Sequence, residues 1–255
     1  MKMPLTFIGT GVWEETDISL KGLEELRDSD VIFAEQYTSE TEDGTIERLE
    51  KLIGKSITVL TREEVEDGKS ILAEAERKRV ALVVAGDPMI ATTHISLKLD
   101  ALKRKIPVRI IHSSSILSAA ISESGLHTYK FGRPATLPFW SEKYKPTSTY
   151  DAIAENLARG LHTMLFLDLK DGKRMTAHEA MDLLLEIEKG KNGKIITPKT
   201  KLLVLSRIGS EAQKLSYGEI GKLQKSKTLG STPFILILPG KLHFTEAEAL
   251  LINSA

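Results

Sequence analysis

Cysteine is missing from the 255-residue sequence, and this absence excludes several kinds of chemistry. A chain without thiols forms no disulfides, has no cysteine nucleophile and binds no zinc through thiolates. An excess of one charge is also missing, because 35 Lys and Arg residues balance 35 Asp and Glu residues. Overall charge therefore provides no attraction to nucleic acid or to an anionic membrane, and we expect neither as a direct partner.

Long apolar runs are missing as well. No segment approaches the length of a membrane span or of a signal-peptide core, and Met1-Lys2-Met3-Pro4 leads directly into a short apolar run. Charged residues make up 27% of the chain and apolar residues 41%, which is an ordinary globular composition. We expect a protein of the cytoplasm that folds throughout, with enough length for two domains.

Short apolar runs alternate with helical periods, which is the pattern of an α/β protein with crossover helices. The runs predict strands at residues 5–8, 31–34, 57–60, 80–84, 108–111, 135–139, 164–169, 202–206 and 234–238. Helical periods lie at residues 20–26, 46–52, 71–77, 97–102, 116–122, 150–157, 177–187 and 245–252. The first five strands suit a parallel sheet. We therefore predict an N-terminal α/β domain over residues 1–112 and a C-terminal α/β domain over residues 113–255.

The most informative segment is residues 85–94, Ala-Gly-Asp-Pro-Met-Ile-Ala-Thr-Thr-His. An apolar strand enters it and a helical pattern follows. Gly86 allows backbone angles that are closed to other residues, and Pro88 fixes the next turn. We expect Thr92 or Thr93 to cap the helix and to leave amides at its start for a polar ligand. The alternative is a bare turn between a strand and a helix.

A second glycine-rich loop, Gly9-Thr10-Gly11, follows the first expected strand. It is not a dinucleotide fingerprint, because Glu14 stands where the third glycine would be, and the full phosphate-loop pattern occurs nowhere. Two glycines two residues apart still let the backbone approach a flat or charged ligand closely. Because both loops follow strands of one parallel sheet, they predict one crevice at its edge.

Further motifs accompany these loops along nearly the whole chain. In the first half they are Phe33-Ala34-Glu35, Tyr37-Thr38-Ser39 and Ser115-Ile116, together with the Ala-Thr-Thr-His that ends at His94. In the second half they are residues 125–132, 159–170 and 238–243, which begin with Gly-Leu-His-Thr, Arg-Gly-Leu-His and Leu-Pro-Gly-Lys. Together these blocks resemble the diphthine synthase family of the tetrapyrrole methylase superfamily.

The resemblance implies a homodimer whose subunits have two α/β domains of the tetrapyrrole methylase type, with S-adenosylmethionine in the interdomain cleft and S-adenosylhomocysteine as product. It also implies a protein substrate, elongation factor 2. The expected reaction is successive N-methylation, three times, of the amino group of a 3-amino-3-carboxypropyl chain on a histidine, which gives diphthine in diphthamide biosynthesis.

The resemblance further implies eight cofactor contacts, which are Val12, Asp87, Ile90, Ser115, Ile116, Leu167, Ile208 and Phe234. The apolar members suit the walls of a cofactor pocket, and Ser115 and Asp87 offer polar partners. Without the resemblance, most of the apolar members would be ordinary core residues. Two positions depart from the family: Ser113-Ser114 stands where Ala-Pro is common, and Phe234 stands where a histidine is common. At Phe234 the expected contact is therefore a ring or backbone contact.

Methyl transfer from a sulfonium to an amine is a direct displacement, so the protein must align the reactants and exclude water. The amine must lose its proton first. Glu35 and Asp168 are candidate proton acceptors because both lie at strand ends, although either carboxylate could simply be solvated. Five basic residues could meet the carboxylate of the substrate chain or acidic parts of the partner, with a solvated face as the alternative: Lys130, Arg133, Lys170, Lys173 and Arg174.

The six histidines could suggest a metal site, but none forms a pair at i, i+4, so we expect structural histidines and no metal. Three other functions remain open at this stage. One is a precorrin or porphyrin C-methyltransferase of the same superfamily. Another is a non-catalytic nucleotide-binding regulator of translation. A nicotinamide oxidoreductase is disfavoured by the missing third glycine.

Overall fold

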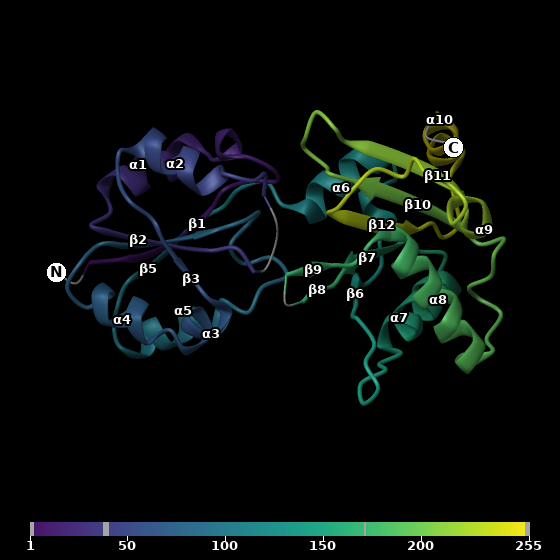
Figure 1. The fold of residues 1–255 in the computed structure, drawn as a ribbon, viewed down its shortest axis with the longest axis horizontal. Coiled ribbons are helices and arrows are strands. Elements are labelled where there is room, and N and C mark those ends of the chain that lie inside the picture. Colours follow the sequence, from purple (N-terminus) through teal and green to yellow (C-terminus); the bar gives the residue numbers. More distant parts are fainter. Residues whose placement is uncertain (1–2, 38–40, 171, 253–255) are drawn as a thin grey trace. The chain divides into compact units, whose positions relative to one another are not determined.

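The computed structural model describes residues 3–37, 41–170 and 172–252. The chain divides into two compact units, Met1–Ala119 and Ala120–Ala255 (Figure 1). The boundary expected from the sequence, after residue 112, lies a few residues earlier. Of the motif residues, Thr38 and Ser39 lie outside the described part of the chain. No helix among the described residues is long and apolar enough to cross a bilayer.

A five-stranded parallel sheet forms the centre of the first unit. Its strands are β1 (Leu5–Gly9), β2 (Val31–Glu35), β3 (Thr58–Leu60), β4 (Val80–Val84) and β5 (Val108–Ile111). The spatial order is β3-β2-β4-β1-β5, so β1 lies between β4 and β5. All residues of β1 and β4 are buried, which is why β4 appears in the sequence as a continuous apolar run and β1 as an apolar run interrupted only by Thr6.

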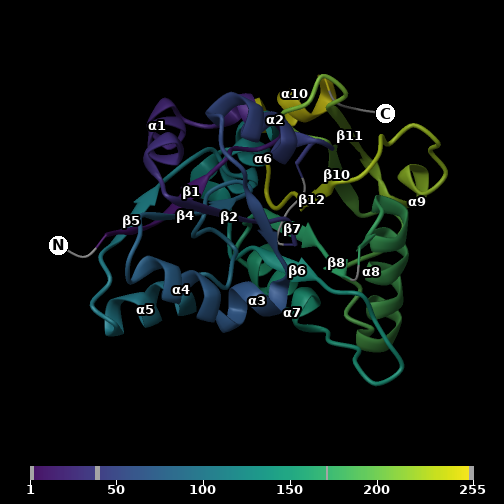
Figure 2. The same ribbon diagram turned by 60° about the vertical axis from the view of Figure 1, so that its left-hand side comes forward.

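Helices cover both faces of this sheet, as Figure 2 shows. On one face lie α1 (Leu20–Asp28) and α2 (Thr45–Ile53), whose buried residues include Leu26 and Leu49. On the other face lie α3 (Arg62–Asp67), α4 (Lys69–Ala75) and α5 (Ile95–Lys103). A 3-10 turn, η1 (Glu15–Asp17), follows β1, and α6 (Ile116–Ser124) follows β5. The crossover helices make all the strand pairs of the sheet parallel.

The second unit contains a mixed five-stranded sheet. Its strands are β6 (Ala135–Leu137), β7 (Thr163–Leu167), β10 (Lys201–Ser206), β11 (Lys214–Glu219) and β12 (Phe234–Leu238), in the order β11-β10-β12-β7-β6. Only the β6–β7 pair in this sheet is parallel. A short hairpin, β8 (Leu169–Lys170) and β9 (Lys173–Arg174), follows β7.

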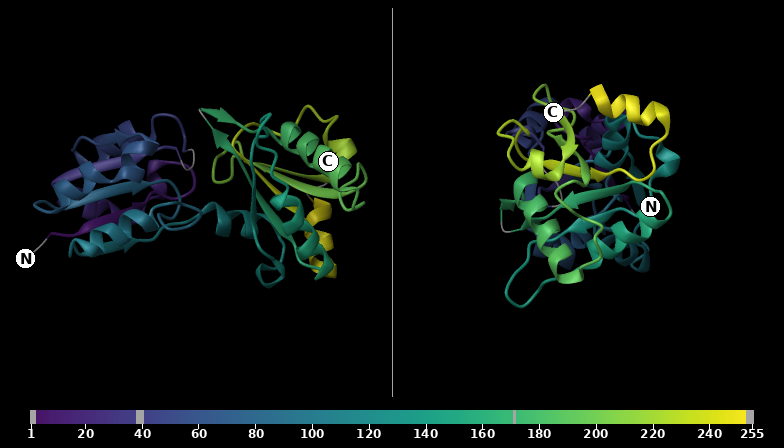
Figure 3. Two further views of the ribbon diagram at one scale, coloured as in Figure 1. Left: turned by 90° about the horizontal axis from the view of Figure 1, so that it is seen from below. Right: turned by 90° about the vertical axis from the view of Figure 1, so that its right-hand side faces the viewer.

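Besides the end of α6, the described residues of the second unit form five helical segments. They are η2 (Thr128–Lys130), α7 (Ser148–Ala158), α8 (Ala177–Lys191), α9 (Ile220–Leu223) and α10 (Phe244–Ile252). The right-hand view of Figure 3 shows α8 and α10 on opposite sides of the sheet. α8 begins with a capping box in which Thr176 and Glu179 satisfy each other's backbone amides. Its buried residues, such as Met181 and Leu184, pack into the main core of this unit.

Most elements confirm the sequence-based prediction, and β4, β5 and β12 match it at both ends. The prediction missed α3 because that helix is six residues long and mostly charged, with only Val65 buried. It missed β11 because Lys214 to Glu219 is an edge strand with no continuous apolar run. The strand expected at residues 164–169 ends at Leu167, and the hairpin begins after it.

Candidate active site

The two glycine-rich loops meet at one edge of the parallel sheet, as the sequence predicts. Gly86 donates its amide to the carbonyl of Gly11 over 2.8 Å, and Gly11 donates in return to Gly86 over 3.4 Å. Thr10 donates its amide to the Val84 carbonyl over 2.9 Å. Because β1 and β4 are parallel neighbours, the loops that follow them leave the sheet side by side.

Gly9, the last residue of β1, lets the loops after β4 and β5 close over the end of that strand. A Cβ atom at this position would lie 2.3 Å from the Gly86 carbonyl oxygen, 2.9 Å from the Ser113 Cβ and 3.0 Å from the Pro88 Cδ. Two of these contacts come from the loop after β4 and one from the segment after β5. The glycine is therefore required by close backbone approach rather than by its own backbone angles.

The loop after β4 is held by hydrogen bonds within itself. Gly86 has a φ of 70°, a left-handed conformation that confirms the prediction made for this glycine. The Pro88 carbonyl accepts hydrogen bonds from the Thr92 hydroxyl at 3.2 Å and from His94 Nδ1 at 3.1 Å. The prediction that Thr92 or Thr93 caps the next helix is wrong, because α5 begins after His94 and no side chain caps it.

Asp87 connects this loop to the end of β5. Its Oδ1 accepts the Met89 amide over 3.0 Å, which is a local turn contact. Its Oδ2 accepts a hydrogen bond from Nδ1 of His112 over 2.8 Å. The Asp87 side chain is 9% exposed, whereas the His112 side chain is 71% exposed. A nearly buried carboxylate therefore fixes the orientation of an exposed imidazole.

The five predicted cofactor residues of the first unit lie on the loops after β1, β4 and β5. Ser115 is nearly buried directly before α6, where its carbonyl accepts the Ala119 amide, and its Cα lies 3.9 Å from a Cβ built on Gly86. Ile90 is an exposed large apolar residue, at 41%. The others, Val12, Asp87 and Ile116, range from nearly buried to half-buried.

The three predicted cofactor residues of the second unit lie at one edge of its sheet. Leu167 ends β7, Ile208 follows the end of β10, and Phe234 begins β12. Because β12 runs antiparallel to both neighbours, the start of β12 meets the ends of β7 and β10. Phe234 is 8% exposed and belongs to the main apolar core, with Leu167 packed against that core. The surroundings of both residues therefore also suit ordinary core residues.

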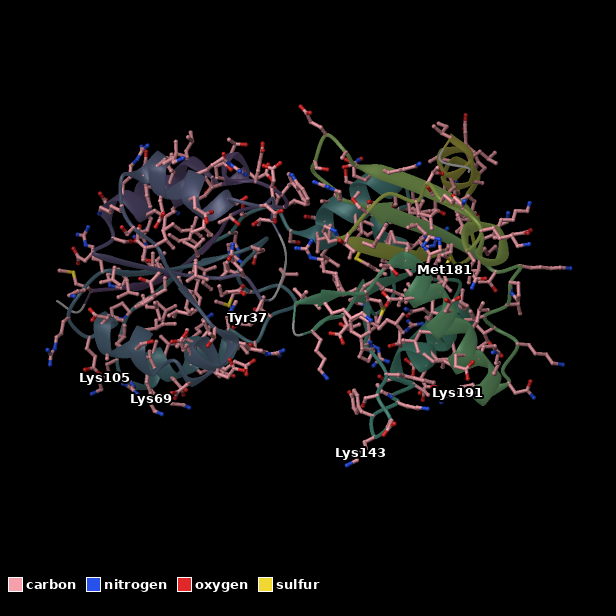
Figure 4. The ribbon with its side chains drawn as sticks, in the orientation of Figure 1. Tyr37, Lys69, Lys105, Lys143, Met181 and Lys191 are labelled. Carbon is pink, nitrogen blue, oxygen red and sulfur yellow. The ribbon has the colours of Figure 1, made fainter. Side chains whose placement is uncertain are left out.

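Glu35 is a candidate proton acceptor from the sequence, but it is only 2% exposed at the end of β2. Its Oε2 accepts the Tyr37 amide over 3.0 Å, and its Oε1 lies 4.0 Å from His94 Nε2. Figure 4 shows Tyr37 at the sheet edge where these loops gather. Burial, followed by the negative charges of Glu35 and Glu66, raises the pKa of Tyr37 above its ordinary value. Glu35, His94 and the half-buried Tyr37 thus form a polar cluster at the end of β2.

The other carboxylate and the basic residues proposed from the sequence have local partners or exposed positions. Asp168 accepts the Phe139 amide over 2.9 Å. Lys173 pairs with Glu179 at 2.9 Å and lies over the Phe139 ring. The Arg133 guanidinium lies 3.6 Å from a Glu155 carboxylate, while Lys170 is exposed in the β8–β9 hairpin with Arg174.

Glu246 is a buried carboxylate that the sequence analysis did not single out. Its oxygens accept backbone amides from His127 at 2.8 Å and His243 at 2.6 Å, and side-chain bonds from Lys130 and from His162 at 3.0 Å. Burial alone would raise its pKa, but these four donors lower it to about 2. The sequence offered no signal that separates Glu246 from Glu248, which is exposed on the same helix.

This cluster explains the three motifs of the second half. His127 and Lys130 belong to the block at residues 125–132, His162 to the block at 159–170, and His243 to the block at 238–243. The Gly240 amide donates to Nδ1 of His162 over 2.9 Å, so the proton of this imidazole lies on Nε2 and points at Glu246. Among the described residues, no three His, Cys, Asp or Glu side chains form a metal-binding group.

Comparison with known proteins identifies the family. The family model for tetrapyrrole (corrin/porphyrin) methylases matches residues 4–224. The chain belongs to this family. It is 44% identical to the diphthine synthase of Methanosarcina acetivorans, over 96% of this chain and 94% of that protein. It is 41% identical to the diphthine synthase of Methanocaldococcus jannaschii, over 96% and 97% respectively.

A crystal structure of diphthine synthase agrees with this assignment. It has a TM-score of 0.90 and 33% sequence identity, and the match covers 98% of this chain and 96% of that chain. The fold of the chain is therefore the tetrapyrrole methylase fold found in diphthine synthases. Its activity is that of an S-adenosylmethionine-dependent methyltransferase of diphthamide biosynthesis.

Proposed function

We propose that the protein methylates the amino group of a 3-amino-3-carboxypropyl-histidine of elongation factor 2 three times, to give diphthine. The observation that carries this proposal is the 44% identity to a diphthine synthase over nearly the whole chain. The alternatives of a macrocycle C-methyltransferase and a non-catalytic regulator have no comparable support.

The loops of the first unit suit S-adenosylmethionine as the cofactor. The cofactor carries a flat base, a ribose and an amino acid end, and therefore needs close backbone approach, apolar walls and a few polar partners. Gly9 and Gly86 allow the backbones of three loops to converge, and Ile90 leaves an apolar side chain exposed beside them. Both carboxylate oxygens of Asp87 accept hydrogen bonds from the protein, so this side chain stabilises the conformation of the loop. When bound, the cofactor supplies a methyl group on a positively charged sulfur.

The proposed cofactor contacts can be tested by comparing two exposed isoleucines. Ile90, at 41% exposure, is a proposed contact, and Ile95, at 51% exposure on α5, is not. Losing a partly buried apolar contact of this size costs about 1.4 kcal/mol, which is tenfold in affinity. We expect Ile90→Ala to weaken binding of S-adenosylhomocysteine about tenfold by calorimetry and Ile95→Ala to leave it unchanged. Equal affinities of the two variants would contradict the proposed contact.

The whole reaction can be tested by intact mass spectrometry of elongation factor 2. The factor bearing the aminocarboxypropyl histidine is incubated with the protein and S-adenosylmethionine, in parallel with the unmodified factor. We expect three successive methyl-sized mass increases on the modified factor and none on the unmodified one. If neither factor gains mass while the cofactor still binds, the proposed substrate is wrong, and a corrin or porphyrin precursor is the next acceptor to test.

We also propose a homodimer in the cytoplasm. Four large apolar or aromatic side chains of the second unit support an assembly surface: Tyr129, Phe244, Leu251 and Ile252 are 98%, 74%, 69% and 83% exposed. Phe244, Leu251 and Ile252 lie on α10, and Glu246 of that helix bonds to His127 and Lys130 on either side of Tyr129, so the four residues come from neighbouring segments. A contiguous exposed apolar patch is typical of a protein contact surface. Light scattering after size exclusion should give twice the 28.2 kDa chain mass. A single-chain mass at micromolar concentration would rule out the dimer.

A further inference from the structure

Asp87 and His112 form a pair that spans the end of β1. The two residues follow β4 and β5, which lie on either side of β1 in the sheet. Their side chains can meet because Gly9 ends β1 without a Cβ atom, so that the flanking loops close over it. The 2.8 Å hydrogen bond between His112 Nδ1 and Asp87 Oδ2 thus depends on the strand order and on Gly9. Asp87 directly follows Gly86, which is hydrogen-bonded to Gly11.

The geometry fixes which nitrogen of His112 carries the proton. Because an ionised carboxylate only accepts hydrogen bonds, Nδ1 of His112 must donate to Oδ2 of Asp87. In a neutral imidazole the lone pair is then on Nε2. With 71% of the side chain exposed, Nε2 is accessible to a molecule from outside. A buried carboxylate that orients an imidazole in this way is the arrangement of a general base.

We infer that His112 is the general base that removes the proton from the substrate ammonium before each methyl transfer, and that Asp87 is its positioning residue. This inference rests on the proposed function. In each round, the ammonium N–H bond breaks, its proton moves to Nε2 of His112, and the amine nitrogen keeps the electron pair. That pair forms the new bond to the methyl carbon as the carbon–sulfur bond breaks, and the electrons of that bond stay on sulfur.

Three rounds release three protons, one from each successive ammonium, and the last product carries a permanent charge with no N–H bond. The exposure of His112 allows water to take each proton from the imidazolium before the next round. While the imidazolium exists, the charge of Asp87 stabilises it. Asp17 is a second acidic residue near this position: its carbonyl accepts the Ser113 hydroxyl, and its carboxylate accepts the amides of Trp13 and Glu14.

The two carboxylates suggested by the sequence are less suited to this step. Glu35 is almost fully buried and already accepts the Tyr37 amide, so its carboxylate offers little surface to a protein-borne amine. Asp168 accepts the amide of Phe139 and belongs to the support of the β8–β9 hairpin. His112 combines exposure, an available lone pair and an orienting partner in one place.

The test compares single-turnover methylation by the full-length wild type, His112→Ala and His178→Ala as a function of pH. His178 is the control histidine. It lies at the start of α8, and its Nε2 contacts the Ser226 carbonyl. General-base catalysis contributes typically 10²–10⁴-fold, so we expect His112→Ala to lose about a hundredfold near pH 7 with unchanged affinity for S-adenosylhomocysteine. The deficit should shrink as pH rises toward 10, because the amine then loses its proton without a base. Added imidazole should restore part of the rate.

Asp87→Asn tests the positioning role separately. We expect a lower kcat with an unchanged KM for the modified factor, because the imidazole loses the carboxylate that orients it and stabilises its charged form. The inference would be overturned, and the proposed function left intact, if the methylation rate of His112→Ala were within about threefold of the wild-type rate at pH 7. A rate deficit that is equal at every pH would have the same meaning. No methylation by the wild type would instead reject the proposed function.

Discussion

Replacing Glu246 by Gln should destabilise the second unit by about 3 kcal/mol. Glu246 is fully buried, and its pKa is lowered from 4.5 to about 2, so at pH 7 the folded state favours the ionised form by about 3 kcal/mol. Breaking a buried ion pair by removing one partner costs a similar 3–5 kcal/mol, as an order of magnitude. The lower figure applies here because Lys130, its cationic partner, is 27% exposed and retains part of its hydration.

The assay is urea unfolding followed by tryptophan fluorescence. The chain has two tryptophans, and Trp140 packs against the core of the second unit, so a Trp13→Phe background reports on that unit alone. With a denaturant slope of roughly 1–3 kcal/mol per molar, Glu246→Gln should lower the midpoint by about 1–3 M. Glu248→Gln is the matched control, because Glu248 is exposed on the same helix. A loss below about 0.5 kcal/mol, or equal losses in both variants, would refute the argument.

The pH dependence of the same variants provides a second check. Because the folded pKa of Glu246 lies below its unfolded value, its stabilisation is complete above about pH 4.5 and is lost as pH falls toward 2. The difference in stability between wild type and Glu246→Gln should therefore shrink over that range. A difference that stays constant from pH 5 to pH 2.5 would show that the charge is not what stabilises the cluster.

Two further changes test the first unit and the β8–β9 hairpin. Gly9→Ala should destabilise the first unit by about 1–3 kcal/mol in urea unfolding and weaken S-adenosylhomocysteine binding in calorimetry, because the new Cβ would overlap the Gly86 carbonyl. Gly190→Ala is the control: nothing lies within 4 Å of a Cβ at that position, so we expect neither effect. Reversing the charges of Lys170 and Arg174 to Glu should raise the concentration of elongation factor 2 needed for half-maximal rate without changing cofactor affinity, and an equal loss of both would reject a substrate contact there.

The first sheet could be predicted from the sequence because its strands are buried on both faces. β4 is therefore a continuous apolar run and β1 an apolar run interrupted only by Thr6, and the intervening helices make parallel pairing the expected arrangement. The edge strand β11 could not be predicted in this way, since Lys214, Ser216 and Glu219 interrupt its apolar residues. It forms because pairing with β10 satisfies its backbone, which is a tertiary effect.

The start of α5 shows a different limit of prediction from sequence. Thr92 and Thr93 are good capping residues by type, yet the Thr92 hydroxyl donates to the Pro88 carbonyl and the helix begins after His94. A local hydrogen bond within the loop competed with the cap and prevailed. The sequence contains both donors and acceptors, but the positive φ of Gly86 and of Ala91 determines which of them meet.

The histidines separate into groups that the sequence could not distinguish. His162 is fully buried and fixed between the Gly240 amide and Glu246, while His94 is fixed against Pro88, so both stabilise the fold. His112 is 71% exposed and donates to the nearly buried carboxylate of Asp87, whereas His127, at 46% exposure, lies 3.8 Å from a carboxylate that Lys130 already neutralises. Spacing along the chain cannot reveal that partnership, because Asp87 and His112 follow two strands, β4 and β5, that are separated by β1, and they meet only through the strand order. A residue dismissed for lacking a helical metal-binding partner thus acquires an acid–base role from its neighbour across the sheet.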